Sequence, residues 1–208
     1  RHTLPVLTLR GTSTIKLHRG SVLAGFANGR VVSFDAETGA VRWNTRVSVA
    51  KGDSEIQRII DIDGNMLEDN GVIYAVSYQG KIAAIDSSSG RRLWQNDASS
   101  HTGMSVGFGN IYVSGEDGSV TAFERSGQGA RWAQTVLARR KVSGSATLSS
   151  YVIVGDFDGY LHALSQVDGH LAARTRVDSD GIQVDLQTIG DMVLVYSNGG
   201  KLATYKLQ

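Results

Sequence analysis

The strongest constraint on the fold is a segment that recurs along the chain. It is clearest in YQGKIAAIDSSSGRRLW, where a glycine-containing turn, a short apolar run, an aspartate, a second glycine and a tryptophan follow one another. The first glycine recurs at intervals of roughly 40 to 50 residues, a period typical of repeat architectures. Five copies align on it, at Gly29, Gly80, Gly118, Gly159 and Gly200. The chain is therefore predicted to consist of similar units stacked in a row.

Each copy predicts two short strands and their turns. In the clearest copy, a two-residue connection ends in Gly80, where a tight hairpin needs a positive φ. Lys81 to Ile85 then reads as an apolar strand. Asp86 ends this strand, and its carboxylate is placed to accept hydrogen bonds from the serine amides that follow. Gly90 supplies a second residue with a positive φ before the chain turns back.

Composition favours an all-β chain. The sequence has 25 glycines and one proline among 208 residues, and 7% of its residues are aromatic, which indicates many tight turns. Short strands in groups of four with a regular period are typical of a β-propeller. A β-sandwich also has short, evenly spaced strands, but it would not repeat Asp-x-x-x-Gly-x-x-x-Trp in register. We expect a propeller of four-stranded antiparallel blades, with about four complete blades and a partial fifth.

The spacing predicts one propeller over residues 1–208, with the inner strand of its second blade near Ile60, after a long insertion. If Thr3 to Leu9 pairs with the incomplete last blade, the ring closes with five blades. If the chain is part of a larger ring, the outward faces of its first and last blades should be apolar. The approximate blades are 12–47, 57–97, 103–136, 143–177 and 182–207, with 1–10 as the outer strand of a preceding blade.

Charge and cysteine content exclude several classes of function. The net charge is +1 and no basic run is longer than Arg139 to Lys141, so neither a nucleic acid nor an anionic membrane is favoured as a partner. The absence of cysteine excludes disulfides, thiolate metal sites and cysteine nucleophiles. No apolar run is long enough to span a bilayer and no signal sequence is visible, so Arg1 is interpreted as a processing boundary.

The tryptophans recur at one position of the repeat. A ring that repeats with the architecture is expected to fill the space between neighbouring sheets, where it buries on the order of 200 Å². The alternative is a stacking surface for a ligand. The fourth copy has Ala173 and Ser165 at the tryptophan and aspartate positions, so it must pack differently. The predicted structural residues are Trp43, Trp94, Trp132, Asp35, Asp86, Gly39 and Gly90.

These motifs resemble a known family. The signature (Phe/Ile)-Asp-x-x-(Thr/Ser)-Gly-x-x-x-Trp resembles the tryptophan-docking repeat of the pyrroloquinoline-quinone (PQQ)-like propellers. LTLRG, from Leu7 to Gly11, and SEIQRIIDIDG, from Ser54 to Gly64, are similar to segments of the BamB family, lipoproteins of the outer-membrane β-barrel assembly (BAM) machinery. The resemblance extends over nearly the whole chain.

The resemblance implies a function without catalysis or cofactor. BamB proteins are eight-bladed scaffolds at the periplasmic face of the outer membrane of Gram-negative bacteria, anchored by a lipidated N-terminal cysteine. They bind the periplasmic domains of BamA and support the insertion of β-barrel proteins; unfolded outer-membrane proteins are a further possible partner. This chain lacks the lipidated cysteine and about three blades of that pattern, and is interpreted as a C-terminal part.

Five residues match the positions at which the family contacts BamA: Leu7, Leu9, Arg10, Asp61 and Asp63. The two leucines share one face of an extended strand, and the two aspartates are likewise two residues apart. One rim could therefore present an apolar pair, a guanidinium and two carboxylates, a mixture that suits a protein partner. The alternative is that Arg10 bridges an aspartate as a structural contact and the leucines are ordinary core.

A metal site is not expected. The Asp-x-Asp pair at 61–63 has other carboxylates nearby, but the spacing matches no stereotyped calcium loop. The histidines lack the spacing of a zinc site or of a base paired with a nucleophile. The residues weighed are Asp53, Glu55, Asp69, His2, His18, His101, His162 and His170.

Two other functions stay open at this point. The same repeat occurs in PQQ-dependent dehydrogenases, but a quinone enzyme needs clustered cations, usually calcium, and a carboxylate base. The chain concentrates no such groups, and the adjacent cysteine pair of those enzymes is absent. The second alternative is a free-standing five-bladed domain that binds proteins.

Overall fold

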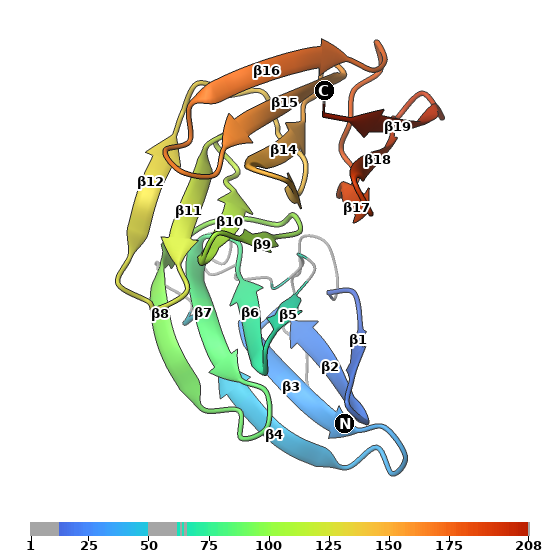
Figure 1. Cartoon of the computed structure of the whole chain (residues 1–208). Helices are drawn as coiled ribbons and strands as arrows, with labels where there is room; N and C mark the ends of the chain where they lie inside the picture. Colours follow the sequence, from blue (N-terminus) through green and yellow to red (C-terminus); the bar gives the residue numbers. More distant parts are fainter. Residues whose placement is uncertain (1–12, 50–61, 63, 65, 208) are drawn as a thin grey trace, which may run out of the picture. The chain divides into compact units, whose positions relative to one another are not determined.

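The computed structural model describes residues 13–49, 62, 64 and 66–207, and in this part the chain is entirely β. Five antiparallel sheets follow one another along the sequence, four with four strands and a last one with three (Figure 1). This confirms the predicted fold class. No helix in the described ranges is long and apolar enough to cross a membrane. The chain divides into two compact units, residues 1–101 and 102–208.

The first unit holds two sheets. In each, consecutive strands are neighbours, so every connection is a hairpin. Ile60 lies outside the described residues; the strand at the inner position of the second sheet is β5, further along the chain. The strands are β1 (Lys16–His18), β2 (Ser21–Phe26), β3 (Arg30–Asp35), β4 (Val41–Arg46), β5 (Leu67–Asp69), β6 (Val72–Val76), β7 (Gly80–Asp86) and β8 (Arg92–Ala98).

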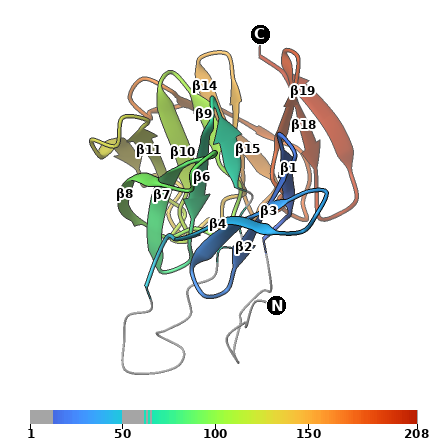
Figure 2. The same cartoon turned by 90° about the horizontal axis from the view of Figure 1, so that it is seen from below.

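The second unit holds three sheets whose first strands contact one another, β9 with β13 and β13 with β17. Figure 2 shows the three-stranded last sheet, in red, beside the orange fourth sheet. The strands are β9 (Ser105–Gly107), β10 (Asn110–Ser114), β11 (Val120–Glu124), β12 (Ala130–Gln134), β13 (Ala146–Leu148), β14 (Tyr151–Gly155), β15 (Tyr160–Ser165), β16 (Leu171–Arg176), β17 (Gln187–Ile189), β18 (Met192–Tyr196) and β19 (Leu202–Lys206).

The sequence repeat reappears as a repeat of strand register. Trp43 pairs with Ser33, Trp94 with Ala84 and Trp132 with Ala122, and in each sheet the register shifts directly after that pair. The fourth sheet has the same shift, after the pair Ala163 and Ala173. A β-bulge at one place in every complete sheet bends each outer strand in the same way.

The turns follow the predicted chemistry with one exception. Asp86 Oδ1 accepts the Ser89 amide at 2.8 Å, and Gly90 has a φ of 71°. In the hairpin turn, however, the positive φ falls on Gln79, at 49°, and not on Gly80. Glycine is required at position 80 for a different reason: a Cβ there would overlap the hydroxyls of Ser77 and Ser48.

Within each unit the cores lie between neighbouring sheets, and the first and last sheets keep exposed apolar faces. Leu17 of β1 is 72% exposed and Ile15 beside it is also exposed. In the last sheet, Tyr196 pairs with Leu202, which is 65% exposed, whereas Val193 and Val195 of the same strand are buried against the fourth sheet. The faces are apolar, as the larger-ring interpretation predicts.

Candidate partner-binding surface

The five predicted contact residues, Leu7, Leu9, Arg10, Asp61 and Asp63, all lie outside the described residues, as do Asp53 and Glu55. The described residues next to them nevertheless show where their two segments are attached. Ser13 is three positions after Arg10, and Ile62 lies between the two aspartates. The site can therefore be approached from Ser13 and Ile62.

Ser13 and Ile62 contact the same residue, Gly25 near the end of β2. The Ser13 hydroxyl accepts the Gly25 amide at 2.7 Å. Ile62 is fully buried, and a Cβ on Gly25 would lie only 2.6 Å from its Cγ2 atom, so only glycine leaves room for this contact. The structure thus brings the attachment points of both segments together on one sheet.

The second unit repeats this junction. Ser143 accepts the Gly155 amide at 2.9 Å, and a Cβ on Gly155 would lie 2.5 Å from Ile182 Cγ2. Ser143 therefore corresponds to Ser13, and Ile182 to Ile62. Three positions before Ser143 the sequence has Arg140, so both junctions carry the pattern Arg-x-x-Ser.

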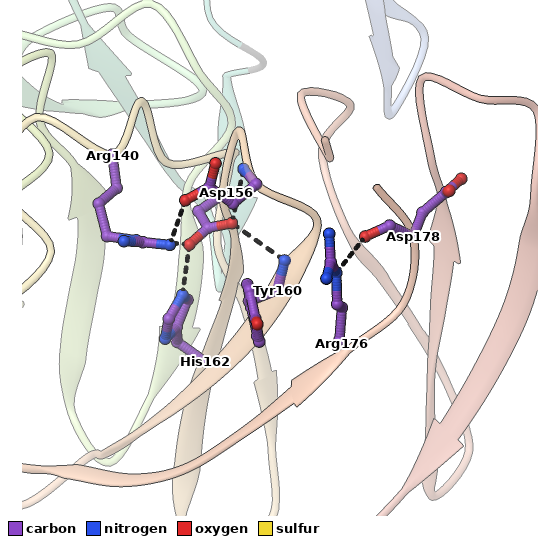
Figure 3. A network of polar contacts seen from close by, with 7 residues as sticks. Arg140, Asp156, Tyr160, His162, Arg176 and Asp178 are labelled. Carbon is purple, nitrogen blue, oxygen red and sulfur yellow. Dashed lines mark hydrogen bonds and ion pairs between the residues drawn. The ribbon is translucent and has the colours of Figure 1, made fainter. Parts of the chain in front are cut away.

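Arg140 is the centre of a polar network that the sequence analysis did not single out. Its Nε atom lies 2.6 Å from Asp156 Oδ2 and its Nη2 atom 2.8 Å from Asp158 Oδ2. His162 Nε2 lies 2.7 Å from the same Asp156 oxygen. Figure 3 shows Arg140 and His162 converging on Asp156. The shared Arg-x-x-Ser was the available sequence signal.

Asp156 holds the network together from a fully buried position. Its other oxygen, Oδ1, accepts the amides of Asp158 and Tyr160 at 3.0 and 2.9 Å, which orders the turn between β14 and β15. Burial acts to raise the pKa of this carboxyl, but the hydrogen bonds from His162, Tyr160 and Arg140 outweigh it and hold the pKa below its ordinary value. The hydrogen bond to Asp156 in turn raises the pKa of Arg140.

The first sheet lacks these carboxylates. When the two turns are aligned on Gly29 and Gly159, both of which have a positive φ, Phe26 stands at the position of Asp156 and Asn28 at that of Asp158. The pattern Arg-x-x-Ser is common to both junctions, whereas Asp156 and Asp158 have no acidic counterpart in the turn of the first sheet.

The tryptophans serve the contact between consecutive sheets. Trp43 Nε1 donates to the Ser87 carbonyl at 3.0 Å, and its ring lies against Gly90. Trp132 Nε1 donates to the Gln166 carbonyl at 3.1 Å, and its ring lies against Gly169. Each indole is thus fixed on a turn of the following sheet, an arrangement that uses both its apolar ring and its polar nitrogen.

At the fourth sheet, where Ala173 replaces the tryptophan, a hollow of about 400 Å³ lies between the fourth and last sheets. Its lining is mostly apolar and includes Ile153, Leu161, Ala173, Val193 and Tyr205. The smaller side chain therefore leaves open the space that an indole occupies in the first and third sheets.

Metal ligands do not gather in the described part of the chain: it contains no group of three or more histidine, aspartate or glutamate side chains that could hold an ion. Three histidines of this part each face a single carboxylate, one in the first unit and two at different places of the fourth sheet. They are His18 with Glu68, His162 with Asp156, and His170 with Asp168.

Comparison with known proteins decides the family. A family model described as outer membrane protein assembly factor BamB matches residues 1–134. The chain belongs to the BamB family. The BamB of Pseudomonas aeruginosa is 48% identical over 206 residues, which cover 99% of this chain and 54% of that protein. The BamB of Escherichia coli is 32% identical over 197 residues, which cover 95% of this chain and 50% of that protein.

Solved structures agree in fold. The crystal structure of BamB from Moraxella catarrhalis matches with a TM-score of 0.91 and 29% identity, covering 99% of this chain and 62% of that one. The computationally designed Ika8 protein matches with a TM-score of 0.72 at 16% identity, a likeness of fold alone. The chain spans about half the length of the curated BamB relatives it matches.

Proposed function

We propose that this chain is the partner-binding part of a BamB-type scaffold in the assembly of outer-membrane proteins. It binds the periplasmic domains of BamA through Leu7, Leu9, Arg10, Asp61 and Asp63 and so supports insertion of β-barrel proteins at the periplasmic face of the outer membrane. The names of its relatives, outer membrane protein assembly factors, support the role in assembly. The choice of BamA as partner comes from the sequence resemblance.

The observation that carries the proposal is the shared contact of Ser13 and Ile62 with Gly25. Two segments that are far apart in sequence, one with Arg10 and one with Asp61 and Asp63, are attached to one sheet. A compact protein interface needs such convergence, because a few clustered residues carry most of the binding energy.

The repeat supports binding over the structural alternative for Arg10. Arg140, the corresponding residue of the fourth sheet, is held by Asp156 and Asp158. The turn of the first sheet has Phe26 and Asn28 at those positions, so it offers no equivalent carboxylate. This difference between the two turns supports a role for Arg10 other than that of Arg140.

The proposed role is non-enzymatic. The relatives, which match between 86% and 99% of this chain, carry the name of assembly factors and not of dehydrogenases. We expect no stoichiometric binding in a calorimetric titration with PQQ and calcium, and micromolar binding would overturn this part of the proposal.

We further propose that additional blades cover the exposed apolar faces of the first and last sheets, in a ring of eight. Leu17 and Leu202 lie on those faces, and exposed apolar patches on a sheet mark a surface that another element covers. The relatives are about twice as long as this chain, which leaves enough sequence for such blades.

The test is binding of purified BamA periplasmic domains to the full chain, measured by calorimetry with thermal melts in parallel. Arg10→Glu should weaken binding strongly, because reversing a charge at an interface leaves a buried group unpaired, a change that commonly costs about 2–5 kcal/mol. Asp61→Ala combined with Asp63→Ala should weaken the same complex. The melting temperature should stay unchanged in both variants.

Arg19→Glu is the matched control. It makes the same charge change at an exposed residue in the turn between β1 and β2. Binding should be retained in this variant. If Arg10→Glu and the aspartate variant also bind normally, the proposal is wrong; if they lose binding together with a large fall in melting temperature, Arg10 is a structural contact instead.

A further inference from the structure

One face of the fourth sheet, on β15 and β16, gathers aromatic and basic side chains. Tyr160 pairs with Arg176 across the two strands, and His162 pairs with Arg174. Residues two apart on a strand share a face, so these four side chains lie on the same side of the sheet. β16 is the edge strand, and all six of its residues are exposed.

The two arginines lie against one ring. The guanidinium carbons of Arg174 and Arg176 are each 5.5 Å from the centre of the Tyr160 ring. Arg176 Nε donates to the Asp178 carbonyl at 3.1 Å (Figure 3). The Arg174 side chain has no hydrogen-bond or ion-pair partner within the described ranges. Two like charges are thus gathered on one surface with most of their hydrogen-bond donors unused.

Two other sheets have a side-chain contact at or beside the corresponding position. In the second sheet the corresponding pair is Lys81 and Asp97, which form an ion pair across the strands. In the first sheet Arg30 donates to the Asn44 side chain at 2.8 Å. The fourth sheet differs because two cations, Arg174 and Arg176, lie on one ring there and neither has a side-chain acceptor.

The backbone that carries the Tyr160 ring is held by the buried network around Asp156. The Tyr160 amide donates to Asp156 Oδ1 at 2.9 Å, and the His162 ring beneath it is bound to the other oxygen of the same carboxylate. The Tyr160 side chain is therefore attached to a backbone that is held in place. Because both guanidiniums rest on this ring, less side-chain freedom is lost when they bind an acceptor.

We propose that this surface, defined by Tyr160, Arg174 and Arg176, binds an extended acidic segment of a partner protein. The segment adds to the open edge of β16, and carboxylates at alternating positions face the two arginines. The open backbone edge favours a protein over a phosphate-bearing lipid, because only a peptide uses the unpaired N–H and C=O groups of an edge strand. The proposal is independent of the contact through Arg10.

Charged residues on an edge strand also guard against aggregation. A charged side chain that prevents aggregation acts by remaining hydrated, so it does not need to be held in a defined conformation. Here both arginines are drawn onto the same ring, which is the geometry of a binding surface. The contrast with the second sheet supports a binding surface. The edge of that sheet is also charged, but its Lys81 is already paired with Asp97 of the same sheet.

The test uses the full chain and a fluorescent peptide of alternating threonine and glutamate, followed by anisotropy. We expect saturable binding that weakens with salt, and a loss of roughly tenfold or more in Arg174→Gln combined with Arg176→Gln. A peptide with glutamine in place of glutamate should not bind. Tyr160→Phe, which keeps the ring, should bind as the native chain does, and Tyr160→Ala should bind more weakly.

Arg46→Gln is the matched control, because Arg46 is the exposed residue of β4 that corresponds to Arg176. It should leave peptide binding unchanged. Equal losses in this variant would show unspecific charge attraction and overturn the proposal. The last part of the experiment uses vesicles of phosphatidylglycerol. If the chain binds these vesicles through Arg174 and Arg176 but does not bind the peptide, the proposal is overturned in favour of a lipid.

Discussion

The junctions before the first and the fourth sheet share one plan and differ in one respect. In both, a serine hydroxyl binds a glycine amide, an isoleucine packs on that glycine, and an arginine stands three positions before the serine. The fourth sheet adds Asp156 and Asp158, which bind its arginine. One copy of the repeat therefore holds its arginine with its own carboxylates, while the corresponding turn of the first sheet has none at those positions.

The largest expected effect comes from removing the acid that distinguishes the two junctions. Asp156→Ala leaves Arg140 and His162 without their common acceptor inside the protein, and breaking a buried pair costs about 3–5 kcal/mol. Urea denaturation should show this loss in the free energy of unfolding. Asp158→Ala, at a residue whose side chain is 46% exposed, should cost less than about 1 kcal/mol. Equal losses would show that burial of Asp156 is not what matters.

The two arginines should respond in opposite ways. Arg140→Ala removes one of several partners of Asp156 and should lower the free energy of unfolding by about 1–3 kcal/mol, with little change in BamA binding. Arg10→Ala should change stability by less than about 0.5 kcal/mol and weaken BamA binding. Urea titrations of both variants measure the change in stability, and calorimetry measures the change in BamA binding. If Arg10→Ala destabilises the chain as much as Arg140→Ala, the proposed difference between the two arginines is wrong.

A smaller effect is expected from giving the first sheet one of the missing acids. Asn28→Asp places a carboxylate at the position that Asp158 has in the fourth sheet. It should compete with the partner for Arg10 and weaken BamA binding by about two- to fivefold, the range of an exposed ion pair. Asn44→Asp adds the same charge on β4 of that sheet and should bind normally. Unchanged binding in Asn28→Asp would mean that this turn does not face Arg10.

The smallest effect concerns pH. The pKa of Asp156 is lower in the folded chain than its ordinary value of about 3.9. Its contribution to stability is therefore complete above pH 4 to 5 and is lost as the pH falls through the folded pKa. Urea midpoints measured from pH 6 to pH 3 should fall less steeply in Asp156→Asn than in the native chain. Parallel slopes would contradict the lowered pKa.

The sequence was sufficient for the features that depend on neighbouring residues. The turn at Asp86, the positive φ of Gly90 and the common register of the tryptophans follow from short-range chemistry repeated in each copy. The apolar outward faces at Leu17 and Leu202 follow from the alternation of residues along a strand.

Features that depend on distant residues were not predicted. The network of Arg140, Asp156 and His162 joins a loop, a turn and a strand, and no pattern within one copy specifies it. The position of the first strand of the second sheet was also misplaced, because the insertion before β5 interrupts the repeat. Likewise, part of the space beside Gly80 is filled by Ser48 from the first sheet, which the hairpin sequence does not contain.

Two of the three indoles, those of Trp43 and Trp132, are anchored on the following sheet, so these contacts have a direction along the sequence. Trp43 is held by the Ser87 carbonyl and Trp132 by the Gln166 carbonyl, in both cases by residues synthesised later. The first and third sheets therefore complete their packing only when the following sheet is in place. Truncation is correspondingly asymmetric. A cut after such a sheet leaves its tryptophan without an anchor on the N-terminal piece, whereas a cut before the sheet leaves only an uncovered turn on the C-terminal piece.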